Sequence, residues 1–377
     1  MEPSAAIRCH LRRLKSRLSC KDNEMRRLPV FLLLDVSDSM IGEPLQYLEK
    51  GLDTLIGKLR QDPNAIETVH LSIIAFAGKV KTLVPLTDLP SFYPPRLQVG
   101  SGTALGLAME HLMAEIDRTV VKTTHERKGD WKPLVYFMTD GKPTDQCQPA
   151  IDQWNQNYAG RVNMVAIGLG PHASTETFLK FADHVLNYNG DDETDFTRFM
   201  EWMTLSLKSQ SVKLVEHLND DFKVSLEKFS NVIEFSKFKP SPDDDHVILV
   251  GRCQTKKSPY LIKYDRMHYP PPFRKNMPEP VNTKITFQIS GVFPVKESYF
   301  EWSGPSSDID PKVGISTLHG GASCPQCGNP IANGFCGCGK MFCISGTGSA
   351  ICPWCGQTTI MEIMKDGDDF DITRSRG

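Results

Sequence analysis

Oxygen-bearing side chains from three separate turns of the sequence could share one metal ion. Asp35, Ser37 and Ser39 follow the run VFLLL, Thr103 lies in VGSGTALG, and Asp140 ends PLVYFMTD. Two carboxylates and three hydroxyls suit a hard divalent cation, because Mg²⁺ prefers oxygen ligands in near-octahedral geometry and keeps some of its waters. If the hydroxyls bind directly while the carboxylates act largely through water, the ion stays electron-poor. We therefore predict a Mg²⁺ site, with Mn²⁺ or Ca²⁺ as alternatives, that takes a carboxylate from another molecule as its last ligand.

Each of these pieces also has an ordinary structural explanation. The stretch DVSDS could cap a helix, Thr103 could be a second helix cap, and Asp140 with Gly141 forms a common turn. Five oxygens in this order favour the metal site. Asp38 and Asp145, the remaining acids of these stretches, are expected to be surface residues.

The same residues argue against hydrolytic chemistry. Phosphatases of the haloacid-dehalogenase type place a nucleophilic Asp at a strand end and a second Asp two residues later as the acid/base. Here Ser37 stands at that second place, so the proton donor is missing. The sequence has no Walker-type phosphate loop after a strand, and no Ser/His/Asp set stands out. We predict a protein that is not an enzyme.

Seven of the eleven cysteines gather near the end of the chain. CPQCG and CPWCG are near-identical knuckles, and each Cys-x-x-Cys pair can present two thiolates to one ion. We predict one structural Zn²⁺ held by Cys324, Cys327, Cys352 and Cys355. Four filled ligand positions leave no place for a reactive water. A redox role is disfavoured because a thioredoxin-like βαβ context is absent.

Three more cysteines lie between the knuckles. Cys336, Cys338 and Cys343 are either spare thiols or part of a second site with His319 as the fourth ligand, which would make a two-metal cross-brace. The single zinc is favoured. Because so short a segment buries little apolar area, zinc binding, worth about 10–16 kcal/mol in zinc fingers, would fold it.

Alternating apolar runs and amphipathic segments predict the fold class: an α/β domain with a doubly wound, mostly parallel sheet. Strands are expected at 30–35, 69–76, 133–140, 162–170 and 184–188, with helices between them. Ligands of such sheets bind beyond the carboxyl ends of the strands. The three segments that carry the predicted Mg²⁺ ligands each enter a helix or turn at that edge.

Composition and pattern changes divide the 377 residues into five regions. We predict a basic extension (1–24) upstream of a natural start at Met25, an α/β domain (25–212), a β-rich accessory domain (213–318), a zinc module (319–363) and an acidic tail (364–377). In the accessory domain we expect strands at 246–254, 258–265, 282–291 and 298–304. A net charge of -2 gives no general attraction to nucleic acid or anionic lipid. No apolar run approaches the ~20 residues of a membrane helix, and the clustered cysteines favour the cytoplasm.

DVSDS, SGT and TDG, in this order, resemble the three metal-binding loops of the von Willebrand factor A domain, whose Asp-x-Ser-x-Ser signature marks a metal-ion-dependent adhesion site. With the β-rich segment and the module from CPQCG to CPWCG, the chain resembles TerY-type proteins of bacterial tellurium-resistance systems over about residues 25–360. The basic leader departs from that pattern.

The resemblance implies a cytoplasmic, metal-dependent interaction scaffold that acts with a Ser/Thr kinase and a protein phosphatase in a stress response. A partner supplying an acidic residue is therefore expected, and no membrane. Two rival functions are a nucleic-acid-associated subunit, which some A domains with zinc modules form, and a Mg²⁺-dependent phosphohydrolase. Few cations between 319 and 363 make nucleic acid the weaker expectation.

Overall fold

The structure is a computed structural model that describes most of the chain. The described residues are 26–125, 128–169, 175–188, 193–215, 233–234, 246–267, 285–304, 311–362 and 370–375. The basic extension predicted for residues 1–24 lies outside them. Within these ranges, no helix is both long and apolar enough to cross a membrane.

The first domain is built on a seven-stranded sheet in the order β3-β2-β1-β4-β5-β6-β7. Its strands are β1 (Leu28–Asp35), β2 (Val69–Phe76), β3 (Val80–Asp88), β4 (Leu134–Thr139), β5 (Asn163–Leu169), β6 (His184–Tyr188) and β7 (Ile233–Glu234). The five central strands are parallel, while β3 and β7 pair antiparallel at the two edges. This is the mostly parallel sheet that the sequence predicted.

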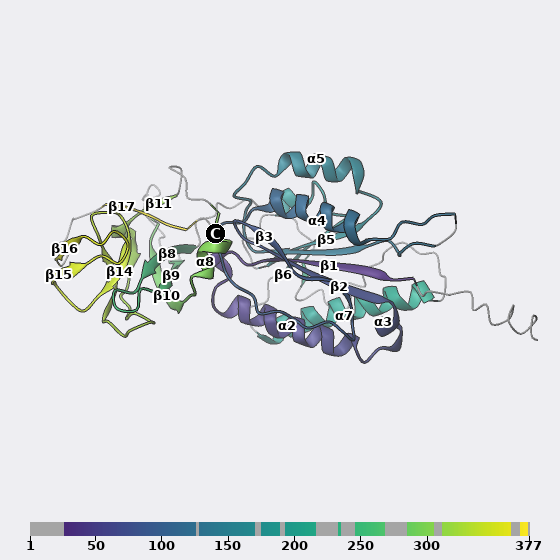
Figure 1. Ribbon diagram of the computed structural model, residues 1–377, viewed down its shortest axis with the longest axis horizontal. Helices are drawn as coiled ribbons and strands as arrows, with labels where there is room; N and C mark the ends of the chain where they lie inside the picture. The colour runs from purple at the N-terminus through teal and green to yellow at the C-terminus, as the bar shows by residue number, and fades with distance from the viewer. Residues whose placement is uncertain are drawn as a thin grey trace, which may run out of the picture.

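Helices cover both faces of this sheet (Figure 1). One face carries α2 (Glu43–Leu59), α3 (Pro63–Thr68) and α7 (Glu193–Val215), and the other carries α4 (Leu105–Thr119), α5 (Gln148–Asn157) and α6 (Thr175–Phe178). Alternate residues of β1 face the two layers: Leu32 belongs to the first core and Phe31 to the second. The short helix η1 (Asp38–Met40) follows β1 directly.

The second domain is a six-stranded sheet in the order β12-β10-β9-β8-β14-β13. Its strands are β8 (His246–Arg252), β9 (Pro259–Arg266), β10 (Phe287–Pro294), β12 (Leu318–His319), β13 (Ile331–Phe335) and β14 (Met341–Ile344). Two strand pairs accompany it: β11 (Lys312–Gly314) with β17 (Asp371–Thr373), and β15 (Gly348–Ile351) with β16 (Thr358–Met361). Two short helices, α8 (Ser298–Trp302) and η2 (Ile315–Thr317), complete the domain.

The predicted boundary between accessory domain and zinc module does not separate two units. Strand β14 of the module pairs in parallel with β8 of the accessory segment, so both segments share one sheet. The acidic tail is also not separate, because β17 pairs with β11. The strand predicted at 298–304 is wrong: residues 298–302 form α8, whose Tyr299 and Trp302 are three residues apart and both buried.

The two domains meet at the carboxyl ends of β1 and β4, with α8 at the junction (Figure 1). Trp302 of α8 joins the core of the first domain. Glycines make this approach possible, since a Cβ at Gly100 would lie 2.5 Å from the Cβ of Trp302, and a Cβ at Gly78 would overlap the backbone nitrogen of Gly304. The edge of the sheet that carries the predicted Mg²⁺ ligands is therefore also the domain interface.

Candidate metal centres

Four of the five predicted Mg²⁺ ligands form one hydrogen-bonded group in the structure. The backbone N–H of Ser37 donates to Asp35 Oδ1 at 2.8 Å, the Ser37 and Ser39 hydroxyl oxygens lie 2.9 Å apart, and Ser39 Oγ donates to Asp140 Oδ1 at 3.0 Å. Thr139, the last residue of β4, donates its hydroxyl to the other oxygen of Asp35. The turn after β1 and the end of β4 thus converge as predicted, because β1 and β4 are parallel neighbours.

Thr103, the fifth predicted ligand, is buried beside the same loop. A Cβ built at Gly141, the residue after Asp140, would lie 3.1 Å from Thr103 Oγ1. The loop before α4 is held on both sides: Gly100 forms a β-bridge with Ser37, and the Thr103 N–H donates to Thr144 Oγ1 at 2.9 Å. The structure therefore brings all five predicted oxygen ligands to one edge.

The electrostatics of this edge fit a divalent cation. Burial, together with the neighbouring Asp140 carboxylate, raises the pKa of Asp35 to about 8. Burial also raises the pKa of Asp140, although the hydrogen bond from Ser39 and the positive charges of Lys263 and His246 oppose that rise. Two neighbouring carboxylates that resist ionisation together are stabilised by a cation between them. Asp35, Ser37, Ser39, Thr103 and Asp140 could hold that ion.

The second domain contacts this edge directly. Lys263 of β9 donates from Nζ to the backbone oxygen of Ser39 at 2.9 Å. Tyr299 of α8 donates its hydroxyl to Asp38 Oδ2 at 3.1 Å, and Ser375 donates to the same oxygen. The loop that carries Ser37 and Ser39 is thus clamped between the two domains.

The prediction that Asp38 is a surface acid is wrong, whereas Asp145 is partly exposed. Asp38 is fully buried under the second domain, and desolvation raises its pKa well above the usual range. Asp145 accepts the backbone N–H groups of Gly106 and Leu107, each at 3.1 Å, at the start of α4. Exposed helix N-termini attract carboxylates in this way. An acid near a predicted metal motif can therefore be purely structural.

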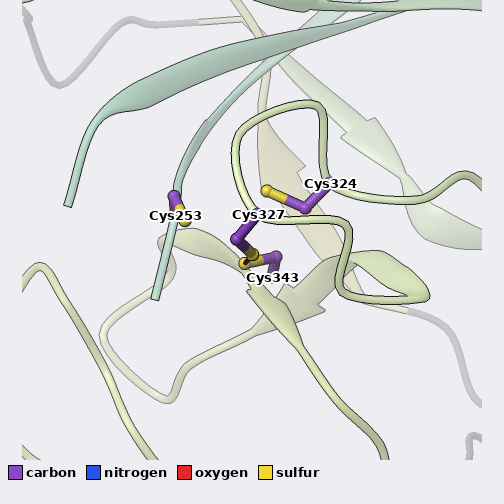
Figure 2. Close-up of side chains that lie close together, drawn as sticks. All are labelled: Cys253, Cys324, Cys327 and Cys343. Carbon is purple, nitrogen blue, oxygen red and sulfur yellow. Dashed lines mark hydrogen bonds between the residues drawn. The ribbon is translucent and has the colours of Figure 1, made fainter. Parts of the chain in front are cut away.

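The cysteines form two groups, each with four sulfur atoms within 4.8 Å of one another. The first group, cluster 1, consists of Cys253, Cys324, Cys327 and Cys343 (Figure 2). Cys253 follows β8, the pair Cys324 and Cys327 comes from the first knuckle, and Cys343 lies in β14. All but Cys327 are buried.

The second group, cluster 2, consists of Cys336, Cys338, Cys352 and Cys355. Cys336 and Cys338 lie in the turn between β13 and β14, and the other two belong to the second knuckle. Cys336 and Cys352 are buried, while Cys338 and Cys355 are exposed.

Both clusters fit tetrahedral zinc and not disulfides. With Zn–S bonds of about 2.3 Å, the sulfurs of a tetrahedral site lie roughly 3.8 Å apart, whereas a disulfide needs about 2.05 Å. The Sγ–Sγ distances are 3.7 Å for Cys327–Cys343, 3.8 Å for Cys336–Cys355 and 3.9 Å for Cys338–Cys352. Each cluster can therefore hold one Zn²⁺ in a closed shell of four thiolates.

In each cluster, hydrogen bonds lower the pKa of one cysteine thiol and so favour its thiolate form. Burial alone would raise the pKa of Cys327, but hydrogen bonds from the Asn329 backbone and from neighbouring thiols lower it to about 7. A hydrogen bond from the Gln357 backbone lowers the pKa of Cys355. Because zinc binds the thiolate form, these residues are the first ligands available at neutral pH.

The structure does not bring together the four cysteines predicted for a single zinc. Cys324 and Cys327 lie in cluster 1, while Cys352 and Cys355 lie in cluster 2. Two sites of four cysteines need eight ligands, and the seven cysteines near the end of the chain are one short of that number. This count was the signal in the sequence that could have indicated two zinc sites with a ligand from elsewhere. The eighth ligand is Cys253 from the accessory segment, whereas the alternative ligand His319 is exposed on β12 and belongs to neither cluster.

Comparisons with known proteins agree with this two-part construction. Residues 30–202 match the von Willebrand factor type A domain, and residues 243–377 match the TerY-C metal binding domain. The uncharacterized protein sll0103 of Synechocystis is 30% identical over 141 residues, which cover 35% of this chain and 30% of that relative. The chain thus spans less than a third of that relative's length.

Two solved structures are similar to about half of the chain. A von Willebrand factor type A protein from Catenulispora acidiphila is 16% identical, with a TM-score of 0.39, over 48% of this chain and 43% of that one. Proximal thread matrix protein 1 from the mussel byssus, solved with a zinc-occupied MIDAS motif, is 18% identical, with a TM-score of 0.36, over 48% of each chain.

The fold and the two kinds of metal centre define a metal-binding scaffold. The chain joins a von Willebrand factor type A domain, whose strand-end oxygen group could hold a divalent metal, to a TerY-C metal binding domain with two cysteine clusters. The TerY-type architecture predicted from the sequence is confirmed.

Proposed function

We propose that the protein is a scaffold that captures an acidic residue of a partner protein through the divalent metal of its first domain. The observation that carries this proposal is the preformed oxygen group, in which Ser39 Oγ lies 2.9 Å from Ser37 Oγ and 3.0 Å from Asp140 Oδ1. The strands behind this group are fully buried, so the ligands are held in place before any ion arrives. When bound, the ion supplies a Lewis-acidic site for an external carboxylate.

The exposure of the ligands supports capture from one side. Asp35, Ser37 and Thr103 are buried, whereas Asp140 and the following residues Gly141 and Lys142 are partly exposed. The second domain also approaches this edge, because Lys263 donates to the Ser39 backbone oxygen and Tyr299 donates to Asp38. The partner carboxylate would therefore approach over the partly exposed residues 140–142.

The TerY-C domain supports a scaffold and not an enzyme. Zinc surrounded by four cysteines has no open position for water or substrate. The two clusters would therefore act by folding the domain and fixing its surface. We propose a non-enzymatic role on this basis.

The resemblance to TerY-type proteins supports a particular set of partners. We propose a Ser/Thr kinase, a protein phosphatase, or both, within a cytoplasmic tellurium-resistance or stress-response system. Nine free cysteines among the described residues suit a reducing compartment.

The replacement Asp35→Asn tests the metal-dependent capture. Asn keeps the shape of Asp but removes a charge that a divalent cation needs, so Mg²⁺ should no longer raise the melting temperature. A ligand at one hundred times its Kd stabilises the wild-type fold by about 2.7 kcal/mol. Thermal unfolding with and without Mg²⁺ measures this effect. Affinity capture of the candidate kinase and phosphatase from native lysate should fail in the variant.

Asp152→Asn, on the exposed face of α5, is the matched control and should behave as wild type. A chelator alone is a weaker test, because it also removes zinc; the zinc content of each variant should be measured. If Asp35→Asn captures the same partner as strongly as wild type, the metal is not the contact.

A further inference from the structure

A cavity of about 550 Å³ lies between the two domains, next to the oxygen site. Its first wall comes from the loop and helix start at Ser101, Gly102, Ala104 and Leu107. Gly102 directly precedes the metal-ligand candidate Thr103. Thr144, which also lines the cavity, accepts the Thr103 backbone N–H at 2.9 Å. The cavity is therefore separated from the metal edge by a single loop.

The opposite wall is apolar and belongs to the TerY-C domain. Phe300, Phe335, Met341 and Trp354 line it. The Phe300 and Trp354 rings meet edge to face, with centroids 5.9 Å apart, and Trp354 Nε1 donates to the Met341 backbone oxygen at 2.7 Å. The guanidinium of Arg252 lies 4.7 Å from the Trp354 ring centroid. The ring is therefore held from several directions.

Cluster 2 builds this wall. Trp354 stands between its ligands Cys352 and Cys355, and the lining residues Gly339 and Lys340 directly follow Cys338. A zinc ion in cluster 2 would thus fix the wall that faces the first domain. This gives the second zinc a role beyond folding its own turn.

The charges of the cavity favour an anionic ligand. Lys340 is exposed, with its ammonium 5.8 Å from the Trp354 ring centroid, and Arg374 is a second cation in the lining. Asp145 is the acid in the lining, and its carboxylate already accepts two backbone N–H groups of α4. A bound divalent metal would add further positive charge beside it.

Leu107 gives the first wall an apolar contact. It belongs to α4, yet 46% of its surface is exposed, and it faces the cavity opposite the aromatic wall. A volume of 550 Å³ with apolar walls and few charges is typical of a ligand pocket. An apolar side chain would fit between Leu107 and Trp354.

We propose that this cavity binds the side chain next to the carboxylate that the metal captures. The ligand is an acidic peptide segment of a protein partner, with an aromatic or large aliphatic residue within one or two positions of its Asp or Glu. Successive residues of an extended peptide are about 3.3–3.6 Å apart, so such neighbours can span adjacent sites. This inference rests on the proposed function and adds the specificity of the partner sequence.

Fluorescence polarisation with labelled hexapeptides tests the proposal on the full-length protein loaded with Mg²⁺ and zinc. One set carries a central Asp with Phe placed one or two positions to either side. The comparison sets carry Ser in place of Phe, or Asn in place of Asp. We expect the best Asp/Phe peptide to bind at least about tenfold more tightly than the matching Asp/Ser peptide, and only in the presence of Mg²⁺.

Leu107→Ser provides the matched test of the cavity. It should remove the preference for Phe while Mg²⁺-dependent binding of the Asp/Ser peptide persists. Leu205→Ser is the control, since Leu205 is 51% exposed on α7 and lies outside the cavity lining. Trp354→Ala, with its zinc content measured, should also remove the preference.

The possible outcomes separate this inference from the proposed function. Equal Mg²⁺-dependent binding of Asp/Phe and Asp/Ser peptides overturns the cavity proposal and leaves metal capture in place. A Phe preference that disappears in Leu107→Ser but needs neither Mg²⁺ nor Asp supports the cavity and overturns metal capture. Absence of binding by every peptide at millimolar concentration contradicts both.

Discussion

The oxygen site and the cysteine clusters hold their ligands in opposite ways. At the oxygen site, buried parallel strands fix Asp35 and Asp140, and hydrogen bonds with Ser39 and Thr139 organise the group. In the clusters, the ligands come from turns and short strands with small cores. We therefore expect the first site to keep its shape without metal and the cysteine clusters to depend on zinc. A preformed site with an open position suits reversible capture, and a closed site suits folding.

The two clusters also differ from each other. Cluster 1 packs against the core of the six-stranded sheet and connects the turn after β8 to β14. Cluster 2 packs with a smaller apolar group that includes Phe342 and Ile344, and it leaves Cys338 and Cys355 exposed. Loss of cluster 1 should therefore disturb the whole TerY-C domain, while loss of cluster 2 should remain local.

Cys253→Ser should have the largest effect. It removes the one ligand that ties β8 to the first knuckle, so a large part of the about 10–16 kcal/mol typical of structural zinc should be lost. We expect the bound zinc to fall from two equivalents to one and the TerY-C domain to unfold at lower temperature. Metal analysis and thermal unfolding measure the two effects. Cys147→Ser, in the first domain, is the control; two retained zinc ions in Cys253→Ser would contradict cluster 1.

Cys355→Ser should have a smaller effect. It opens the exposed cluster 2, so one zinc should be lost while the six-stranded sheet remains folded. Far-ultraviolet circular dichroism should change little, and the fluorescence of Trp354 should report the local change because this residue adjoins Cys355. Loss of both zinc ions would show that the clusters fold as one unit and would remove the distinction between them.

Lys263→Met should have the smallest effect and tests whether the oxygen site is independent of the second domain. The Lys263 ammonium donates to the Ser39 backbone oxygen and opposes the rise that burial causes in the pKa of Asp140, so it also opposes a second cation at this edge. Its removal should tighten Mg²⁺ binding roughly two- to fivefold, because like charges repel even when partly screened. Calorimetric titration measures this, with Lys256→Met as the exposed control. Weaker binding would mean that Lys263 mainly holds the loop.

Much of the first domain could be predicted because its strands and its oxygen ligands are each marked by a short, continuous stretch of sequence. The strands at 69–76 and 184–188 coincide with β2 and β6, and the oxygen ligands lie within short motifs at strand ends. β3 was missed: it is an edge strand that includes Pro85 and is largely half-buried, so it lacks a strong apolar alternation.

The second domain was harder to predict because its key contacts join distant segments. The pairing of several cysteines cannot be deduced from their spacing alone. Cys253 lies in a stretch without other cysteines, and only the parallel pairing of β8 with β14 brings it to Cys343. The burial of Asp38 likewise depends on Tyr299 and Ser375 of the other domain.

Trp302 has a consequence for how the chain can be divided. Its indole is 7% exposed and packs among the core residues of the first domain, although it is encoded after β10 of the second. A fragment that stops after α7 would contain the strands and helices of the first domain as far as α7. It would lack Trp302, so the core residues that pack against the indole would be left without that contact. The core of the first domain is thus completed by a side chain of the second, and a recombinant excision should retain α8.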